Sequence, residues 1–270
     1  MKRKLGINVD CLRTRLDNLS TMELARKIGF ESITSAGLYT LEEIAPLKKR
    51  ADELGMELPY LHAPYKGINA LWGSDEEAAD MMGQITEMID AVAACGVPAV
   101  VFHVSSGWNP PAINDRGLAH FDAVVDYAEE KGVVLCIENQ RKVGYVSYMM
   151  DRYENRDAVR FCFDCGHEHS MTQTVSWQDI FTTKLTATHI HDNMGQRVDE
   201  NGKDGDLHWL PLDGTFDYHT MMRKLDTYGY EGPLMLEVFN LRRADYQEMT
   251  PEEFLSTAYD RIKRISLMGE

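Results

Sequence analysis

The sequence lacks any long hydrophobic run. Within its 270 residues no segment approaches the roughly 18 consecutive apolar residues that a membrane span requires. The opening segment MKRKLGINVD reaches Asp10 without the apolar region of a signal peptide. These absences predict a cytoplasmic chain that has no membrane partner.

Basic residues and cysteines are both scarce. There are 28 Lys and Arg against 43 Asp and Glu, a formal net charge of −15. Broad nucleic-acid binding depends on neutralising phosphates with Lys and Arg, so this balance disfavours a nucleic-acid partner, although it allows a local basic patch. The cysteine count is five, an odd number that fits a reducing compartment. Cys162 and Cys165 form a C-x-x-C in an extended segment, where positions three apart face opposite ways, so we interpret them as unpaired and structural.

What the sequence does contain is a regular alternation of short apolar runs and longer amphipathic stretches. With 44% hydrophobic and 26% charged residues, one sizeable core is expected. Runs rich in β-branched and aromatic residues lie at 4–10, 32–37, 57–63, 98–105, 133–139, 159–165, 187–192 and 233–239. Eight strands with helical spacers in a chain of this length predict an α/β fold, a (β/α)8 barrel forming a single domain over 1–270.

The spacers carry helix-start signals. Capping-box spacing occurs at Thr40 with Glu43, at Ser74 with Glu77, and at Thr250 with Glu253, where Pro251 occupies the first helical position. The longest irregular stretch is 193–216, between the seventh and eighth strands. Loops of that length inside compact domains are often functional.

Ionisable residues gather where the predicted strands end. They are His62, His103, Glu138, Asp164 followed by His167, His191 and Glu237, with Asp206 and His208 on the loop 193–216. Burying one such group without a partner is costly, and barrel enzymes place their chemistry at the carboxyl ends of the strands. Converging carboxylates and imidazoles are typical ligands of a divalent cation. His189 shares a strand face with His191 but lies deeper, so we expect it to have a supporting or packing role.

Seven segments in this order resemble the xylose isomerase-like TIM-barrel superfamily. They are LHAPY, FHVSSG, CIENQ, FDCGH, HIHDN, DLHWLPLDGTFDY and LMLEV, spread from about residue 57 to residue 240. The superfamily includes sugar-phosphate isomerases and epimerases, ketose 3-epimerases and type IV apurinic endonucleases. The resemblance therefore implies an isomerase or epimerase that acts on a sugar or a related polyol or keto compound.

The resemblance also implies a site. By position it assigns the metal ligands to Glu138, Asp164, His191 and Glu237, and substrate contacts to His62, His103, His167, Arg197 and His208. Three carboxylates and one imidazole favour Mn²⁺, Mg²⁺ or Co²⁺, with Zn²⁺ as the alternative if further histidines bind. Glu138 and Glu237, from the fifth and eighth strands, would transfer protons next to the sugar carbonyl.

Two other functions stay open. His62, His103, His167, Asp206 and His208 added to the four ligands match the nine ligands of the trinuclear zinc cluster in type IV endonucleases. The acidic charge and the segment PLDGTFDY, which resembles sugar isomerases, favour the isomerase instead. A non-catalytic metal- or sugar-binding barrel is the third reading.

The sequence does not decide which compound of the sugar class is the substrate, or whether the chain forms a homo-oligomer. Ketose 3-epimerases usually have a proline and a glutamate where this chain has Asn139 and Gly144. No glycine-rich phosphate loop is present, so an unphosphorylated compound has the same standing as a sugar phosphate. Trp72, Trp108 and Trp209 are candidates for an aromatic platform under the sugar or for packing.

Overall fold

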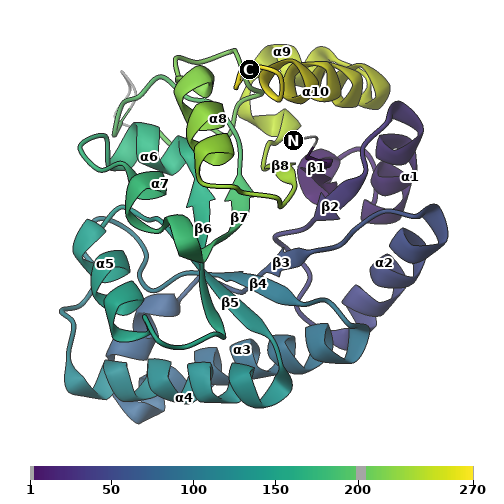
Figure 1. The fold of residues 1–270 in the computed structure, drawn as a ribbon. Helices are drawn as coiled ribbons and strands as arrows, with labels where there is room; N and C mark the ends of the chain where they lie inside the picture. Colours follow the sequence, from purple (N-terminus) through teal and green to yellow (C-terminus); the bar gives the residue numbers. More distant parts are fainter. Residues whose placement is uncertain (1–2, 199–204, 270) are drawn as a thin grey trace.

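A ring of parallel strands occupies the centre of the molecule in the computed structural model, which describes residues 3–198 and 205–269 (Figure 1). The strands are β1 (Leu5–Asn8), β2 (Ser32–Thr34), β3 (Tyr60–His62), β4 (Ala99–Phe102), β5 (Val134–Glu138), β6 (Val159–Asp164), β7 (Leu185–His189) and β8 (Leu234–Leu236). One sheet has the order β2-β1-β8, and the other runs from β3 to β7. Single parallel bridges, Ser32 to Glu57 and Ile190 to Leu236, join the sheets. The predicted α/β barrel is confirmed.

The strands are shorter than the apolar runs predict. The run 98–105 yields only Ala99–Phe102, and the run 187–192 yields Leu185–His189. Strand β7 pairs with β6 as far as the register of Asp164 with His189, and the next residue, Ile190, bridges to β8 instead. The run therefore continues past the ladder, and its last residues, Ile190 to Asp192, stay fully buried.

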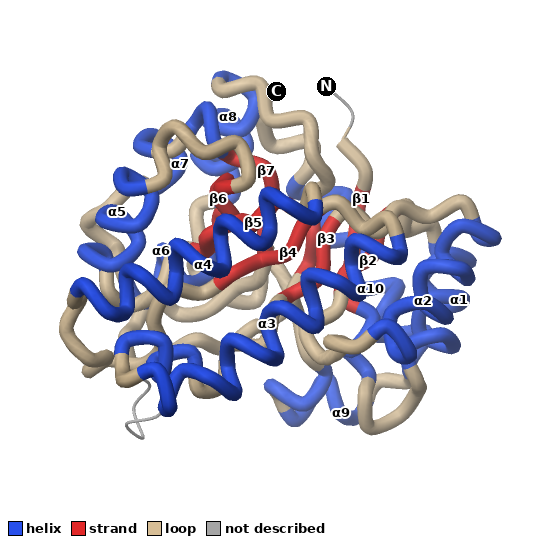
Figure 2. Tube along the Cα trace, turned by 90° about the horizontal axis from the view of Figure 1, so that it is seen from below, coloured by secondary structure: helices blue, strands red, loops and turns tan. Residues whose placement is uncertain are grey.

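Helices surround the ring, as Figure 2 shows from below. They are α1 (Asn18–Ile28), α2 (Leu41–Leu54), α3 (Asp75–Cys95), α4 (Asp115–Lys131), α5 (Val143–Arg152), α6 (Cys165–Met171), α7 (Trp177–Ile180), α8 (Tyr218–Thr227), α9 (Ala244–Glu248) and α10 (Pro251–Ile265). Short 3-10 turns occupy Val9–Leu12, Ile68–Trp72, Thr182–Lys184 and Asn240–Arg242. All three predicted capping boxes form, at the starts of α2, α3 and α10.

Alternation along each strand divides the barrel interior into an apolar part and a polar part. Successive strand residues face opposite sides, so every second residue points inward. The inward residues nearest the strand starts form a buried cluster of Tyr60, Ala99, Val101, Cys136, Cys162, Ala187 and Met235. Two residues further along on the same face stand His62, His103, Glu138, Asp164, His189 and Glu237. The period of the strand therefore places these polar groups together above an apolar plug.

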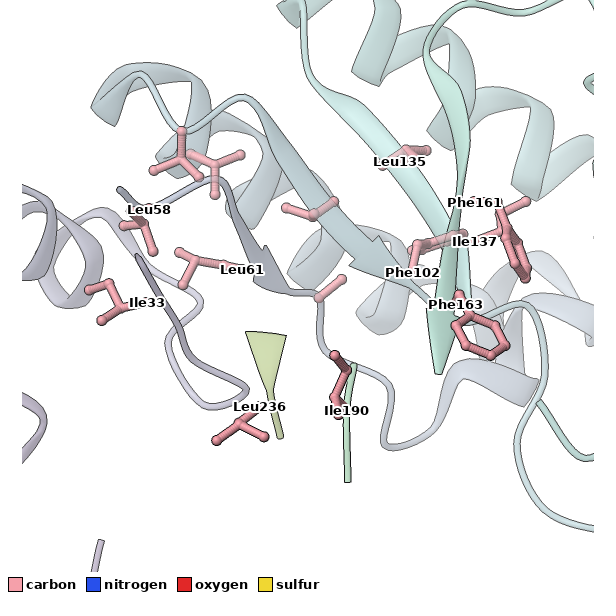
Figure 3. Packing of buried hydrophobic residues seen from close by; sticks show 14 of the residues in the cluster. Ile33, Leu58, Leu61, Phe102, Leu135, Ile137, Phe161, Phe163, Ile190 and Leu236 are labelled. Atoms are coloured by element: carbon pink, nitrogen blue, oxygen red, sulfur yellow. The ribbon is translucent and has the colours of Figure 1, made fainter. Parts of the chain in front are cut away.

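The outward residues form the larger core between strands and helices. Figure 3 shows part of it, with Ile33, Leu61, Phe102, Ile137, Phe163 and Leu236 projecting from the strands. This layer is rich in branched and aromatic side chains that are almost fully buried. It fixes the strands, and through them the inward-facing polar groups.

The expectations about membrane spans and about the cysteines can be compared with the structure. Within residues 3–198 and 205–269, no helix is long and apolar enough to cross a bilayer. All five cysteines are free, as predicted, and Cys162 and Cys165 do not share a site: the first lies in the inner cluster, whereas the thiol of the second donates to the backbone oxygen of His191.

Candidate metal and substrate site

A cavity of about 910 Å³ opens at the carboxyl ends of the strands. Seven of the predicted site residues line it: His62, His103, Glu138, His167, Asp206, His208 and Glu237. Asp164 and His191 are completely buried immediately beneath it. The structure thus gathers all of the predicted ligands at one end of the barrel.

Four side chains form a central group at the floor of the cavity. They are Glu138, Asp164, His189 and Glu237, whose ligand atoms all lie within 4.8 Å of one another. The Nδ1 atom of His189 is 2.5 Å from Glu138 Oε1 and 3.4 Å from Glu237 Oε2. It is 3.9 Å from Asp164 Oδ2. Three of the four residues assigned by the resemblance are present, but the imidazole among them belongs to His189.

His191 lies in a different group from the one assigned to it. Its Nε2 atom is 3.1 Å from Asp164 Oδ1 and 3.8 Å from Asp206 Oδ1, and it clusters with His167, Asp206 and His208. His189 is the last residue of β7 and His191 follows the strand, so the two imidazoles approach different side chains although they are two residues apart in the chain. His189 was expected to have a supporting or packing role; its ring lies among three carboxylates and hydrogen-bonds to Glu138, and whether it supports the site or binds a metal stays a prediction.

A second group lies on the other side of Glu138. His62 Nε2 is 3.1 Å from His103 Nε2, and His103 Nε2 is 2.6 Å from Glu138 Oε2. In the third group, Asp206 Oδ2 is 3.3 Å from His167 Nε2, and Asp206 Oδ1 is 3.3 Å from His208 Nε2. Glu138 connects the first two groups, and Asp164 stands between the first and third. The three groups form one continuous network.

Burial and ion pairing oppose each other throughout this network. Burial alone would raise the pKa of Glu138, but the attraction of His189 and the hydrogen bond from His103 hold it well below its usual range. Burial lowers the pKa of His189, but the charges of Glu237 and Glu138 outweigh it and raise the pKa to about 9. For His103, burial wins and lowers the pKa to about 4.

The same balance holds in the third group. Burial would lower the pKa of His208, yet the charge and hydrogen bond of Asp206 raise it to about 9. Burial would also lower the pKa of His167, but Asp164 and Asp206 raise it well above its usual range. Protons thus compensate the buried carboxylates here.

This donor set fits divalent cations. Metal binding requires neutral imidazoles and ionised carboxylates, so a cation would replace the protons that now neutralise the network. The Nδ1 atom of His191 is buried and has no hydrogen-bond partner among the described residues. The central group, with three carboxylates, would hold Mn²⁺, Mg²⁺ or Co²⁺, while the imidazole-rich second and third groups favour Zn²⁺.

Local sequence explains how the ligands are aimed. Asp164 ends β6 and caps α6, accepting a hydrogen bond at 2.7 Å from the backbone N–H of His167, so one turn brings both side chains to the site. The side chain of Asn139 bonds to both backbone groups of Asp164, at 2.7 and 2.8 Å, which ties the end of β5 to the end of β6. Gly166 leaves room for His191, because a Cβ there would lie 2.0 Å from its ring.

The long loop is held by a buried carboxylate that sequence reasoning did not single out. Asp192 accepts backbone hydrogen bonds from Asn193 at 2.9 Å, Leu212 at 2.9 Å and Phe216 at 3.2 Å. His208 on this loop has a positive φ of 46° and is fixed by a bond between its Nδ1 and the backbone oxygen of Glu237. Asp192 therefore anchors the segment that carries Asp206 and His208.

Arg197 and the three candidate tryptophans do not all lie at the cavity. Arg197 does not line the cavity; its guanidinium carbon lies 5.2 Å from the centre of the Trp108 ring, and Trp108 does line it. Trp72 is in the core, where its indole N–H donates to Val104 O at 2.9 Å, and Trp209 lies beside Arg243.

Gln140 was missed as a site residue. Its Nε2 atom is 2.8 Å from Glu138 Oε2 and 3.0 Å from His103 Nε2. It lines the cavity directly above the second group. Only its position directly after β5, two residues from Glu138, could have pointed to it.

Comparison with known proteins identifies the family of the chain. The sequence model of the xylose isomerase-like TIM barrel family matches residues 22–263. The chain belongs to this family. An uncharacterized protein of Sinorhizobium fredii, y4fM, is 29% identical, with 89% of this chain and 90% of that protein covered.

Solved structures share the fold of this family member. D-psicose 3-epimerase from Clostridium cellulolyticum, determined with D-tagatose, has a TM-score of 0.76 at 16% identity, covering 97% of this chain and 99% of its own. The 3-keto-D-glucoside 4-epimerase YcjR from Escherichia coli has a TM-score of 0.73 at 15% identity, covering 97% and 100%. At this identity the similarity shows the fold.

Proposed function

We propose that the protein is a metal-dependent isomerase or epimerase of small sugars or sugar-like compounds. The carrying observation is that two members of the central group, Glu138 and Glu237, line the cavity, while Asp164 and His189 are buried beneath. These two carboxylates come from the end of β5 and from the residue after β8, and both approach Nδ1 of His189. This arrangement supports proton removal and proton return at a carbon next to a carbonyl. The epimerases of the same fold support the class.

The residues of the chain divide the work. A divalent cation, when bound, acts as a Lewis acid that stabilises negative charge on the substrate oxygens. Glu138 and Glu237 both line the cavity, and each would accept or return a proton there. Asp164 and His189 hold the floor, and His103 and Gln140 fix Glu138 through hydrogen bonds to its Oε2. If both glutamates exchange protons, the product is an epimer; if one does so on both carbons, an aldose–ketose pair results.

Hydrogen exchange with solvent tests this proposal. The protein is incubated with Mn²⁺ in D₂O with a panel of ketoses and aldoses, and deuterium at each carbon is followed by NMR. We expect deuterium at C3 of a ketose for an epimerase, or at C1 for an isomerase. Sugar binding by calorimetry with no exchange anywhere in the panel would instead support a non-catalytic binding barrel.

One observation favours a second candidate, a three-zinc phosphodiesterase of the apurinic endonuclease type. All nine residues of that reading lie in the three connected groups. The net charge of −15 opposes it, because duplex DNA is held largely by basic side chains. Zn²⁺-dependent incision of an abasic duplex at physiological salt would promote it above the isomerase. We retain a single-domain, cytoplasmic enzyme as part of the proposal.

A further inference from the structure

The charged side chains that line the cavity separate by sign. The carboxylates Glu138, Asp206 and Glu237 belong to the ligand groups at the floor. The remaining charged lining residues are basic: Arg13, Lys66, Arg141 and Arg242. They follow β1, β3, β5 and β8, respectively, so the loops of several strands contribute them. These four residues, called the basic wall below, form a local positive patch in a chain with 15 more acidic than basic residues.

Two of these arginines are held against one aromatic ring. The guanidinium carbon of Arg13 lies 5.1 Å from the centre of the Phe239 ring, and that of Arg242 lies 5.9 Å from it. Such cation–π contacts restrain an arginine without using its N–H donors. Asp10, almost fully buried, also accepts a hydrogen bond at 3.0 Å from Arg13 Nη2. The pair is therefore positioned in advance of any ligand.

The arginine pair stands next to the ligand groups. The ring of Phe239 is 5.5 Å from the ring of His208, in the third group. Phe239, His208 and Lys66 all line the same cavity as Glu237. A ligand that reaches the central group through its oxygens would thus have its other end close to Arg13 and Arg242. Among the described residues, no carboxylate forms an ion pair with Lys66 or Arg242.

We propose that the substrate is an anionic sugar whose phosphate or carboxylate is bound by Arg242, Arg13 and Lys66. The proposal rests on the proposed sugar chemistry of the central group and adds the substrate class. Guanidinium groups bind both anions through paired N–H donors, and a lysine adds a point charge. An anion would otherwise be repelled by the acidic chain, so a basic wall provides a reason for its selective entry. This site needs no glycine-rich phosphate loop.

The test measures binding, so that it does not depend on turnover. Calorimetry on the Mn²⁺-loaded protein compares D-fructose, D-fructose 6-phosphate and D-fructuronate, which separate neutral, phosphate and carboxylate forms. We expect at least one anionic sugar to bind at least tenfold more tightly than D-fructose. R242Q and K66Q should each reduce this preference at least fivefold, and the preference should weaken with added salt.

Matched controls keep the result specific. Arg223 is an exposed arginine on α8 that donates to Thr220, and Lys263 on α10 lies 5.9 Å from the Tyr259 ring centre. R223Q and K263Q should leave the preference unchanged. Equal binding of neutral and anionic sugars overturns the inference, even if the neutral sugar exchanges hydrogen with solvent. A preference for anionic sugars without hydrogen exchange supports the anion site but contradicts the proposed reaction. An R242Q-sensitive incision of abasic DNA, with no anionic sugar bound, assigns the wall to a phosphodiester and overturns it.

Discussion

His189 and His191 are only two residues apart, yet their rings belong to different groups of acidic side chains. His189 Nδ1 lies 2.5 Å from Glu138 Oε1, in the central group, whereas His191 Nε2 lies 3.1 Å from Asp164 Oδ1, toward the third group. Asp164 is the residue that both rings approach. The last residue of β7 and the segment directly after it thus supply two adjoining groups.

This relationship predicts unequal effects on metal binding. H189Q should lower Mn²⁺ affinity by more than the roughly 10- to 100-fold typical of supporting residues, and H191Q should stay within that range. Competition with a chelator measures both. His219 is on the outer helix α8, where its Nδ1 atom bonds to the backbone oxygen of Met268, so H219Q serves as the control. Loss of the tight site in H191Q but not in H189Q would restore the ligand set that the sequence resemblance assigns.

The two glutamates that line the cavity should be separable from metal binding. E138Q and E237Q keep the side-chain volume but remove the charge and the proton-accepting oxygen. At saturating metal each should lose ~10²-fold or more in turnover, the scale of general acid–base catalysis. Under an epimerase mechanism one variant should retain hydrogen exchange on a single face of the substrate. E231Q, on the exposed segment before β8, should behave as wild type. Near-normal turnover in both glutamate variants would refute the proton-transfer role.

Loss of the Asp192 anchor should loosen the loop that carries Asp206 and His208. D192N replaces an acceptor oxygen with an N–H₂ group that faces backbone N–H donors. We expect a loss of about 1–3 kcal/mol in unfolding free energy and faster proteolysis within the loop. D217N is the control, because asparagine caps helices as well as aspartate does, and Asp217 caps α8. Unchanged loop proteolysis in D192N would show that other contacts hold it.

Acid stability should depend on a surface link between α7 and α8. Asp179 accepts hydrogen bonds from Lys224 at 2.8 Å and from Tyr228 at 2.7 Å, and these lower its pKa to about 2. A depressed carboxyl pKa stabilises the fold above the unfolded value of 3.8, and the contribution disappears as the pH falls through about 2. Because the side chain is 42% exposed, we discount the shift to about 1 kcal/mol.

Comparing wild type with D179N by denaturant unfolding at pH 7 and at pH 2 checks this sign. The difference should be near 1 kcal/mol at pH 7 and smaller at pH 2. A difference that grows on acidification would contradict the assignment.

Strand periodicity is what made the barrel and most of the site predictable. Apolar runs separated by amphipathic stretches predicted all eight strands, and inward alternation predicted that Glu138, Asp164 and Glu237 lie together. The end of β7 was less visible in the sequence, because the apolar run continues through His191, which has the same side chain as His189 and the same place in the alternation. Their separation is set by where β7 stops pairing with β6, which depends on tertiary packing.

Loop residues were the least predictable part of the site. The pairing of Arg13 with Arg242 joins the two ends of the chain through Phe239, and nothing local to either arginine signals it. Trp72 follows β3 on a short turn, but its direction depends on packing against Phe121, 4.8 Å away between ring centres. Contacts of this kind are specified by the assembled barrel.

The closure of the ring has a mechanical consequence. Between β7 and β8 the two sheets meet at the single bridge of Ile190 with Leu236, without a continuous ladder. The central group straddles this seam, because Glu237 follows β8 while Glu138, Asp164 and His189 end strands of the other sheet. A cation held there would bind side chains from both sheets, so the sheets could not separate at this seam without releasing it. Removing the cation with a chelator should then increase local opening along this edge. Amide hydrogens beside Ile190 would exchange with solvent faster than those of β4 and β5.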